Sequence, residues 1–165
     1  MVSETVFYGG AMAGSDSSLQ LVTFQLGAEK YGIDIMEVKE IVDYEEIRGI
    51  PNAPVYVEGI YNLRGDIIPI ISLHRRFHIQ RAADVEEDSL LIVMIGGMQL
   101  GIVIDRVLRV ITIDQDQIQP PPQMISGIGA EYIRGVVHQD EGYLIILDSI
   151  RLFDPEELKQ ISQYA

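Results

Sequence analysis

The histidines are the residues of this sequence best suited to metal chemistry. There are three of them, His74, His78 and His138. His74 and His78 are four residues apart and would share one face of a helix, which is the geometry of a zinc-binding pair. A zinc hydrolase of that type also needs a glutamate between them as general base, whereas two arginines and a phenylalanine stand there. Arginines repel a cation, so we interpret all three histidines as surface residues and predict no metal site.

Motifs for covalent catalysis and for cofactor binding are missing as well. Ser126–Gly129 does not complete a Gly-x-Ser-x-Gly nucleophile motif, and Gly127-Ile128-Gly129 lacks the third glycine of a dinucleotide fingerprint. The chain has no cysteine, so thiolates are excluded. A pair of carboxylates acting on a glycoside stays open, because acids are plentiful, but nothing in their spacing indicates one. We therefore expect no enzyme activity, no catalytic residues and no cofactor.

Two charged residues stand in unusual surroundings. Glu40 lies within the apolar run 38–42, and Arg64 lies in the turn Asn62-Leu63-Arg64-Gly65. An acid in a strand and an arginine in a tight turn can form a planar, bidentate ion pair. The alternative is that water solvates both. We favour the pair, in which Gly65 would take the positive-φ position and Asn62 would cap the turn.

The charge balance limits the partners of the chain. Its 165 residues include 12 basic and 25 acidic ones, a formal net charge of −13. This charge opposes binding to phosphate backbones, so we expect no nucleic-acid partner. No apolar run approaches the roughly 18 residues of a membrane span, and the N-terminus lacks the pattern of a signal peptide. We expect a protein of the cytoplasm, a reducing compartment that the absence of cysteine also fits, with no direct membrane insertion.

The sequence repeats itself. Residues 24–42 are similar in sequence to residues 93–111 at a constant spacing of 69. Residues 56–77 are similar to residues 132–153 at a constant spacing of 76. Identities are few, but they include Tyr56/Tyr132, Gly59/Gly135 and Phe77/Phe153. Ordered coincidences of glycine and apolar positions are typical of one structural unit built twice.

Each copy has the pattern of short antiparallel strands. The alternation in 19–26 predicts a half-buried strand, 27–30 a turn and 31–35 a return strand, and 90–104 repeats this hairpin. A β-branched run and a second hairpin follow in both copies. We predict an all-β fold of small barrels, with a flexible tail over 1–18, a first subdomain over 19–81, a linker near 82–88, a second subdomain over 89–153 and a C-terminal helix over 154–165. Asp154-Pro155-Glu156-Glu157 is a typical helix start.

An aliphatic series could serve either the core or a binding surface. It comprises Ile35, Val38 and Ile41, with Val107 and Leu108 at matching places in the second copy. One interpretation is that these residues are ordinary core. The other interpretation is that they line a groove between the barrels, with room for a partner helix.

Several motifs resemble those of the CheW family, the bacterial chemotaxis coupling proteins. They are Tyr31-Gly32-Ile33-Asp34-Ile35, Val38-x-Glu40-Ile41, Asn62-Leu63-Arg64-Gly65, Pro69-Ile70, Gly101-Ile102-Val103-Ile104-Asp105-x-Val107 and Gln119-Pro120-Pro121-Pro122. The likeness covers about residues 19–153. Ser72 stands where many members carry aspartate.

The resemblance implies two intertwined five-stranded barrels of the Src-homology-3 type, related by a pseudo-two-fold axis. It also implies a non-catalytic adaptor that joins the signalling tips of methyl-accepting chemotaxis receptors to the regulatory domain of the histidine kinase CheA. Such an adaptor would be recruited to membrane-associated receptor arrays, and rings with further CheW copies are compatible with it.

Site residues follow from the same resemblance, position by position. A receptor-binding groove would be lined by Val22, Ile35, Val38, Ile41, Val107 and Leu108. A kinase-binding surface would comprise Ile47, Ile50, Asn62, Leu63, Arg64 and Gly65. Glu40 and Arg64 would form the structural ion pair.

Two other functions stay open at this point. The same fold could serve a kinase pathway other than chemotaxis, such as surface motility. A barrel protein that binds or hydrolyses a ligand with clustered carboxylates is the alternative from another class.

Overall fold

The computed structural model describes residues 17–44, 47–84, 88–125, 128–140 and 142–165. Its elements, in chain order, are β1 (Ser18–Leu26), β2 (Glu29–Asp34), η1 (Ile35–Glu37), β3 (Val38–Asp43), β4 (Val57–Leu63), β5 (Asp66–Ser72), α1 (Leu73–Phe77), β6 (Ser89–Ile95), β7 (Met98–Ile104), β8 (Arg106–Asp114), η2 (Gln115–Gln117), β9 (Met124–Ile125), β10 (Ile128–Gly129), η3 (Ala130–Tyr132), β11 (Ile133–Gln139), β12 (Gly142–Leu147), η4 (Ser149–Arg151) and α2 (Pro155–Ser162). No helix formed by these residues has the length and apolar character needed to cross a bilayer.

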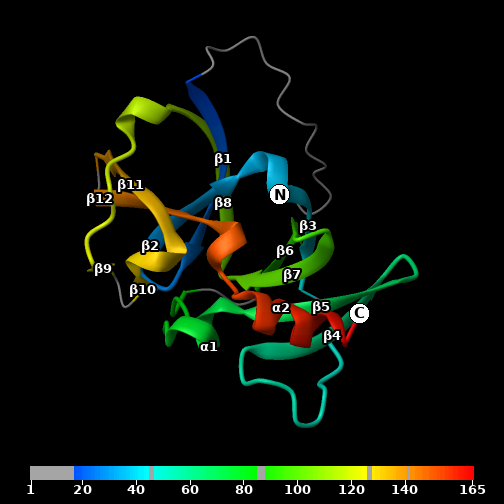
Figure 1. Cartoon of the computed structure of the whole chain (residues 1–165). Helices are drawn as coiled ribbons and strands as arrows, with labels where there is room; N and C mark the ends of the chain where they lie inside the picture. Colours follow the sequence, from blue (N-terminus) through cyan, green and yellow to red (C-terminus); the bar gives the residue numbers. More distant parts are fainter. Residues whose placement is uncertain (1–16, 45–46, 85–87, 126–127, 141) are drawn as a thin grey trace.

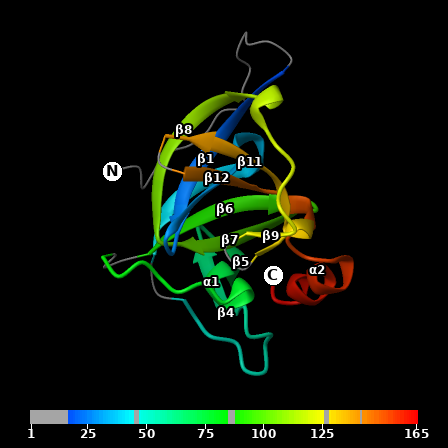
Figure 2. The ribbon, with the colours of Figure 1, turned by 90° about the vertical axis from the view of Figure 1, so that its left-hand side faces the viewer.

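Two five-stranded sheets make up the fold, and they exchange hairpins (Figure 1). One sheet has the order β3-β6-β7-β5-β4, and the other has the order β11-β12-β2-β1-β8. The first sheet therefore takes the hairpin β6-β7 from the second half of the chain. The second sheet takes β1-β2 from the first half. In the view of Figure 2 one sheet lies above the other.

The strand register follows the sequence repeat residue by residue. In the parallel pair β5-β7, Ile70 lies opposite Gly101, and in β12-β2, Ile146 lies opposite Gly32. These pairs are equivalent under the two spacings, since 70 and 146 differ by 76 and 32 and 101 by 69. The fold class predicted from the sequence, two intertwined barrels related by a pseudo-two-fold axis, is confirmed.

The bulges of the two sheets also match. Lys39 is the extra residue of β3 against β6, and its counterpart Leu108 is the extra residue of β8 against β1. A bulge bends a strand and increases its twist. The bulges therefore bend β3 and β8 at equivalent places.

A shared glycine lets the chain close each barrel. A Cβ on Gly59 would lie 2.1 Å from the carbonyl oxygen of Arg48, and one on Gly135 would lie 2.8 Å from that of Gln119. At these points the connector crosses back onto β4 or β11, through the bridges Arg48↔Ile60 and Gln119↔Val136. Any side chain there would push the connector away, which explains why both copies carry glycine.

Exchange of hairpins places apolar side chains on both faces of several strands. Leu21 packs in a small cluster inside the second sheet, whereas its neighbour Val22 belongs to a large cluster between the sheets. A third cluster, with Ile68 and Ile92, fills the first sheet. The large cluster contains residues of both sheets, so neither sheet could bury its inner face alone.

The domain ranges predicted from the sequence describe repeats rather than separate bodies. Residues 19–81 and 89–153 each contribute strands to both sheets. The predicted tail, 1–18, falls outside the described residues up to residue 16, and β1 begins at Ser18. The C-terminal helix occupies Pro155–Ser162 and starts with a capping box between Asp154 and Glu157.

Candidate functional site

Four of the six residues predicted to line a receptor groove are core residues in this structure. Each is at most 8% exposed and belongs to the large cluster between the sheets; they are Val22, Ile35, Val38 and Ile41. A partner helix cannot touch side chains that the protein itself covers. In the free protein these four side chains lie beneath the surface, and their place in a receptor groove stays a prediction.

The exposed part of the predicted groove lies on β8. Leu108 is 37% exposed and Val110 is 40% exposed, while Val107 is partly buried against the large cluster. Among the strands of the described residues, β8 lies at the edge of the second sheet and pairs with β1 alone. The bulge at Leu108 turns this aliphatic side chain out of the regular alternation. The strand thus presents an aliphatic strip at the border of the second sheet.

The residues predicted to bind a kinase lie at the other sheet. Asn62–Gly65 form the turn between β4 and β5, where the Asn62 side chain accepts a hydrogen bond of 2.9 Å from the Gly65 amide. Arg64 and Gly65 both have positive φ, as expected of a two-residue hairpin turn. Leu63 is buried in the first sheet. Ile47 and Ile50 are half-buried on the preceding connector.

Glu40 and Arg64 lie together, with Arg64 Nη2 donating to Glu40 Oε1. Glu40 is buried in β3, whereas 65% of the Arg64 side chain is exposed. The bulge at Lys39 shifts the alternation so that Glu40 faces the interior of the first sheet. Arg64 therefore covers a carboxylate that would otherwise lie without a counter-charge.

Arg76 lies where the two copies meet, a role that the sequence interpretation missed. Its guanidinium carbon lies 4.7 Å from the ring centre of Phe153, 5.0 Å from that of Tyr56 and 5.5 Å from that of Tyr132. Phe77 is a fourth ring, at 5.8 Å. The four rings are two pairs of equivalent positions, 56 with 132 and 77 with 153, so Arg76 stacks among aromatics drawn equally from both copies.

Arg76 also forms hydrogen bonds that hold the C-terminal helix α2 in place. Its Nη1 and Nη2 each donate to a carboxylate oxygen of Glu157 at 2.8 Å, and its Nε donates to the Leu152 carbonyl at 2.9 Å. Burial alone would raise the pKa of Glu157, but the hydrogen bonds from Arg76 and from the Asp154 amide outweigh it and lower that pKa. Glu157 is therefore ionised at neutral pH, and α2 stays joined to the region between the sheets.

A second buried polar centre surrounds Asp105, at the end of β7. Asp105 is 1% exposed, and its Oδ2 accepts hydrogen bonds from the amides of Gly27 at 2.6 Å and Ala82 at 3.1 Å. Its Oδ1 lies 2.9 Å from Nε2 of His74, which is also buried. The interpretation of His74 as a surface residue was wrong. The isolated acid after the apolar run 100–104 was the available sequence signal.

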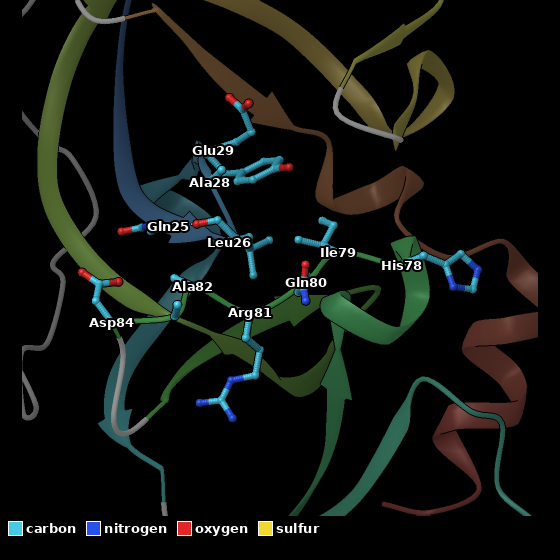
Figure 3. A pocket seen from close by; sticks show the side chains of 13 residues that line it. Gln25, Leu26, Ala28, Glu29, His78, Ile79, Gln80, Arg81, Ala82 and Asp84 are labelled. Carbon is cyan, nitrogen blue, oxygen red and sulfur yellow. Dashed lines mark hydrogen bonds between the residues drawn. The ribbon is translucent and has the colours of Figure 1, made fainter.

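The hollow above this centre has a volume of about 560 Å³. It lies between the β1-β2 turn and the segment 78–84 (Figure 3). Leu26 and Ile79 face each other across it, while the Arg81 side chain points away from them. Asp105 thus fixes the segment between the two copies against the first hairpin. This explains the polar centre as structural support.

Glu37 is an acid with one buried oxygen that accepts no hydrogen bond from the described residues. Its Oε2 atom is buried and unpaired in η1. The pKa of Glu37 is raised to about 7, mainly by burial and to a lesser extent by the charges of Asp34 and Asp148, while Arg134 opposes the rise. The folded protein therefore holds a proton here over a pH range in which the unfolded chain has lost it.

Replacing Glu37 with glutamine should remove a pH dependence of stability. Between the ordinary pKa of 4.5 and the folded value of about 7, the folded state binds more protons, so stability falls as pH rises. At pH 8 we expect Glu37→Gln to raise the free energy of unfolding by about 1–3 kcal/mol, with little change at pH 4.5. Urea denaturation at both pH values measures the difference. Glu131→Gln, at an exposed site, is the control, and an equal gain at both pH values would contradict the account.

Metal chemistry finds no support in the described part of the chain. No group of three or more histidine, aspartate or glutamate side chains there could hold a metal ion. His78 is exposed at the end of α1, and His138 packs on Tyr143 with 4.4 Å between ring centres. The β8 strip and the β4-β5 turn stay the predicted partner surfaces.

Known proteins similar to this chain agree on one family. The family model described as a CheW-like domain matches residues 20–157. A chemotaxis protein CheW of Treponema pallidum (strain Nichols) is 55% identical over 155 residues, which cover 92% of this chain and 91% of that protein. The chemotaxis protein CheW of Klebsiella aerogenes is 36% identical over 93% of both chains. The crystal structure of the scaffolding protein TtCheW from Thermoanaerobacter tengcongensis superimposes with a TM-score of 0.78 at 36% identity, and covers 88% of this chain and 94% of that one.

Proposed function

This chain belongs to the CheW family of chemotaxis scaffold proteins, and from that premise we propose that it couples chemoreceptor tips to the regulatory domain of the histidine kinase CheA. Binding to receptor tips would recruit it to membrane-associated arrays. The proposal assigns it no reaction of its own.

The observation that carries the proposal is the separation of two surfaces on one small body. The β8 strip belongs to one sheet and the Asn62–Gly65 turn belongs to the other. A body with two such surfaces can hold two partners at once. The second binding event then benefits from a raised effective concentration, so neither contact needs high affinity.

Kinase control follows from this geometry. When the receptor and the kinase are bound to the same scaffold, a ligand that shifts the receptor between two states also shifts the kinase, provided that their contacts through the scaffold differ between those states. The large cluster shared by both sheets supports this proposal, because closely packed interiors transmit displacement.

Replacing Arg64 with alanine should weaken both stability and kinase binding. The change leaves the buried Glu40 carboxylate without its counter-charge, for which we expect a loss of about 1–2 kcal/mol and a fall of about 3–6 °C in melting temperature. Kinase activation in a reconstituted array should fall at least about fivefold, because arginines in the centre of an interface carry much of its energy.

A double variant separates the two effects. Adding Glu40→Gln to Arg64→Ala removes the buried charge, so the melting temperature should recover while kinase activation stays low. Arg151→Ala, which removes an exposed arginine elsewhere, is the matched control. Wild-type values of both quantities in Arg64→Ala would show that the pair serves neither purpose.

Pull-down experiments test the proposal as a whole. The chain is presented with a receptor signalling tip, with the kinase regulatory domain, and with both. We expect each partner to bind alone and the two to bind together. Competition between them, or retention of neither, would refute the coupling role.

A further inference from the structure

The second sheet has a hollow at the place equivalent to the Glu40–Arg64 ion pair of the first sheet. Two adjoining cavities of about 440 and 340 Å³ share the residues Lys30, Arg109 and Gln139. The remaining lining residues come from β1, β8, β12 and the β11-β12 turn; they are Thr23, Val107, Leu108, Ile111, Leu144 and Asp140. We call this hollow the second mouth.

The repeat identifies the counterpart of the second mouth in the first sheet. Under the spacing of 69, Arg109 corresponds to Glu40, and under the spacing of 76, Asp140 corresponds to Arg64. In the first sheet this pair is joined and closes the barrel end. In the second sheet the charges are exchanged. Among the described residues no ion pair joins Arg109 to Asp140, and the cavity lies between them.

The residues that line the second mouth are also more polar than their counterparts in the first sheet. Thr23 stands where the first sheet has Ile92, and Gln139 stands where it has Leu63. Ile92 and Leu63 are both buried and apolar, and they fill the first mouth. Gln139 replaces an aliphatic branch with a hydrogen-bonding amide. The Thr23 hydroxyl instead donates to the Arg109 carbonyl at 2.6 Å and accepts from the Arg109 amide at 3.1 Å, which fixes the backbone of Arg109. The second mouth is thus polar, cationic and open at positions that the first mouth fills.

We propose that the second mouth binds the carboxylate of an acidic side chain presented by a partner protein. Lys30 and Arg109 supply charge-assisted hydrogen bonds to a carboxylate, and Gln139 adds an amide donor. Ile111 and Leu144 provide an aliphatic floor for the methylene groups of a glutamate.

The net negative charge of the molecule favours a single carboxylate over a polyanion as the ligand of the second mouth. A net charge of −13 repels nucleic acids, whereas two cations at short range suffice for one acid. Asp140 also lines the hollow, and because its negative charge opposes an incoming carboxylate, the two cations must outweigh it. Val107 and Leu108 of the predicted receptor groove line this hollow, which makes it continuous with that proposed interface. The inference rests on the proposed function only in taking the ligand to be part of a protein.

Titration of the full chain with two capped tripeptides tests this inference. The probes are acetyl-Val-Glu-Val-amide and acetyl-Val-Gln-Val-amide, followed by backbone amide shifts in NMR spectra. We expect the glutamate peptide to bind at least about tenfold more tightly than the glutamine peptide and to shift the amides around Lys30, Arg109 and Gln139. Arg109→Gln should abolish the preference. Arg151→Gln, which removes the same charge from an exposed site, should keep it.

The outcomes separate this inference from the coupling role. Equal binding of the two peptides, or an undiminished preference in Arg109→Gln, would overturn it. Free glutarate is the third probe, and if it bound as tightly as the glutamate peptide, the site would be one for a small dicarboxylate and the docking of a partner would be disproved. None of these results bears on the pull-down with receptor and kinase, which tests the coupling role independently.

Discussion

Replacing Asp105 with alanine is expected to lower the free energy of unfolding by about 3–5 kcal/mol, the range for removal of one partner from a buried charged network. The change leaves the amides of Gly27 and Ala82 and the ring of His74 without their acceptor. The melting temperature of a chain of this size should fall by about 10 °C. Thermal unfolding followed by circular dichroism gives this value directly.

Two control variants define the cause. Asp84→Ala removes an exposed acid that pairs with Arg106, and it should cost less than about 0.5 kcal/mol. Asp105→Asn keeps an oxygen acceptor and should cost less than Asp105→Ala. If Asp105→Ala had the same melting temperature as the wild type, the hydrogen-bond network around Asp105 would contribute nothing to stability.

Replacing Leu108 with glutamate should reduce binding to a receptor tip at least about tenfold. The side chain is 37% exposed on an edge strand, so a charge there stays in contact with water in the free protein but would be desolvated under a partner. Co-sedimentation with receptor signalling tips measures the loss. Kinase binding at the opposite sheet should be unchanged.

Position 108 is a better test than position 38 of the same predicted groove. Val38 is 5% exposed within the large cluster, so a charge there would damage the fold and its effect on binding could not be interpreted. Val55→Glu is the matched control, since Val55 is an exposed aliphatic residue on the β3-β4 connector. Normal receptor binding by Leu108→Glu, with a normal melting temperature, would remove β8 from the receptor surface.

The sequence repeat predicted the architecture because its few identities are structural necessities. Gly59 and Gly135 allow the connectors to cross, and Tyr56, Tyr132, Phe77 and Phe153 surround Arg76 between the copies. The same steric and packing needs recur in both copies. For that reason the match at two fixed spacings was sufficient to predict two equivalent barrels.

Burial of individual residues was harder to predict. An alternating pattern shows which residues share a face, but here both faces of a strand can be buried because the sheets exchange hairpins. Val22 and Val38 are therefore indistinguishable in sequence from aliphatic groove residues, although they are core. His74 and Asp105 are 31 residues apart in the chain and meet only through the fold. Pairings of that kind depend on topology, which no local pattern encodes.

The coupling role is tested most directly by kinase activity in a reconstituted system. Receptors in vesicles are combined with the kinase in the presence and absence of this chain, and the rate of kinase autophosphorylation is measured with and without the receptor's ligand. The account predicts that the rate becomes sensitive to the ligand only when the chain is present, and that Leu108→Glu and Arg64→Ala each abolish most of that sensitivity. Equal ligand responses with and without the chain would contradict it.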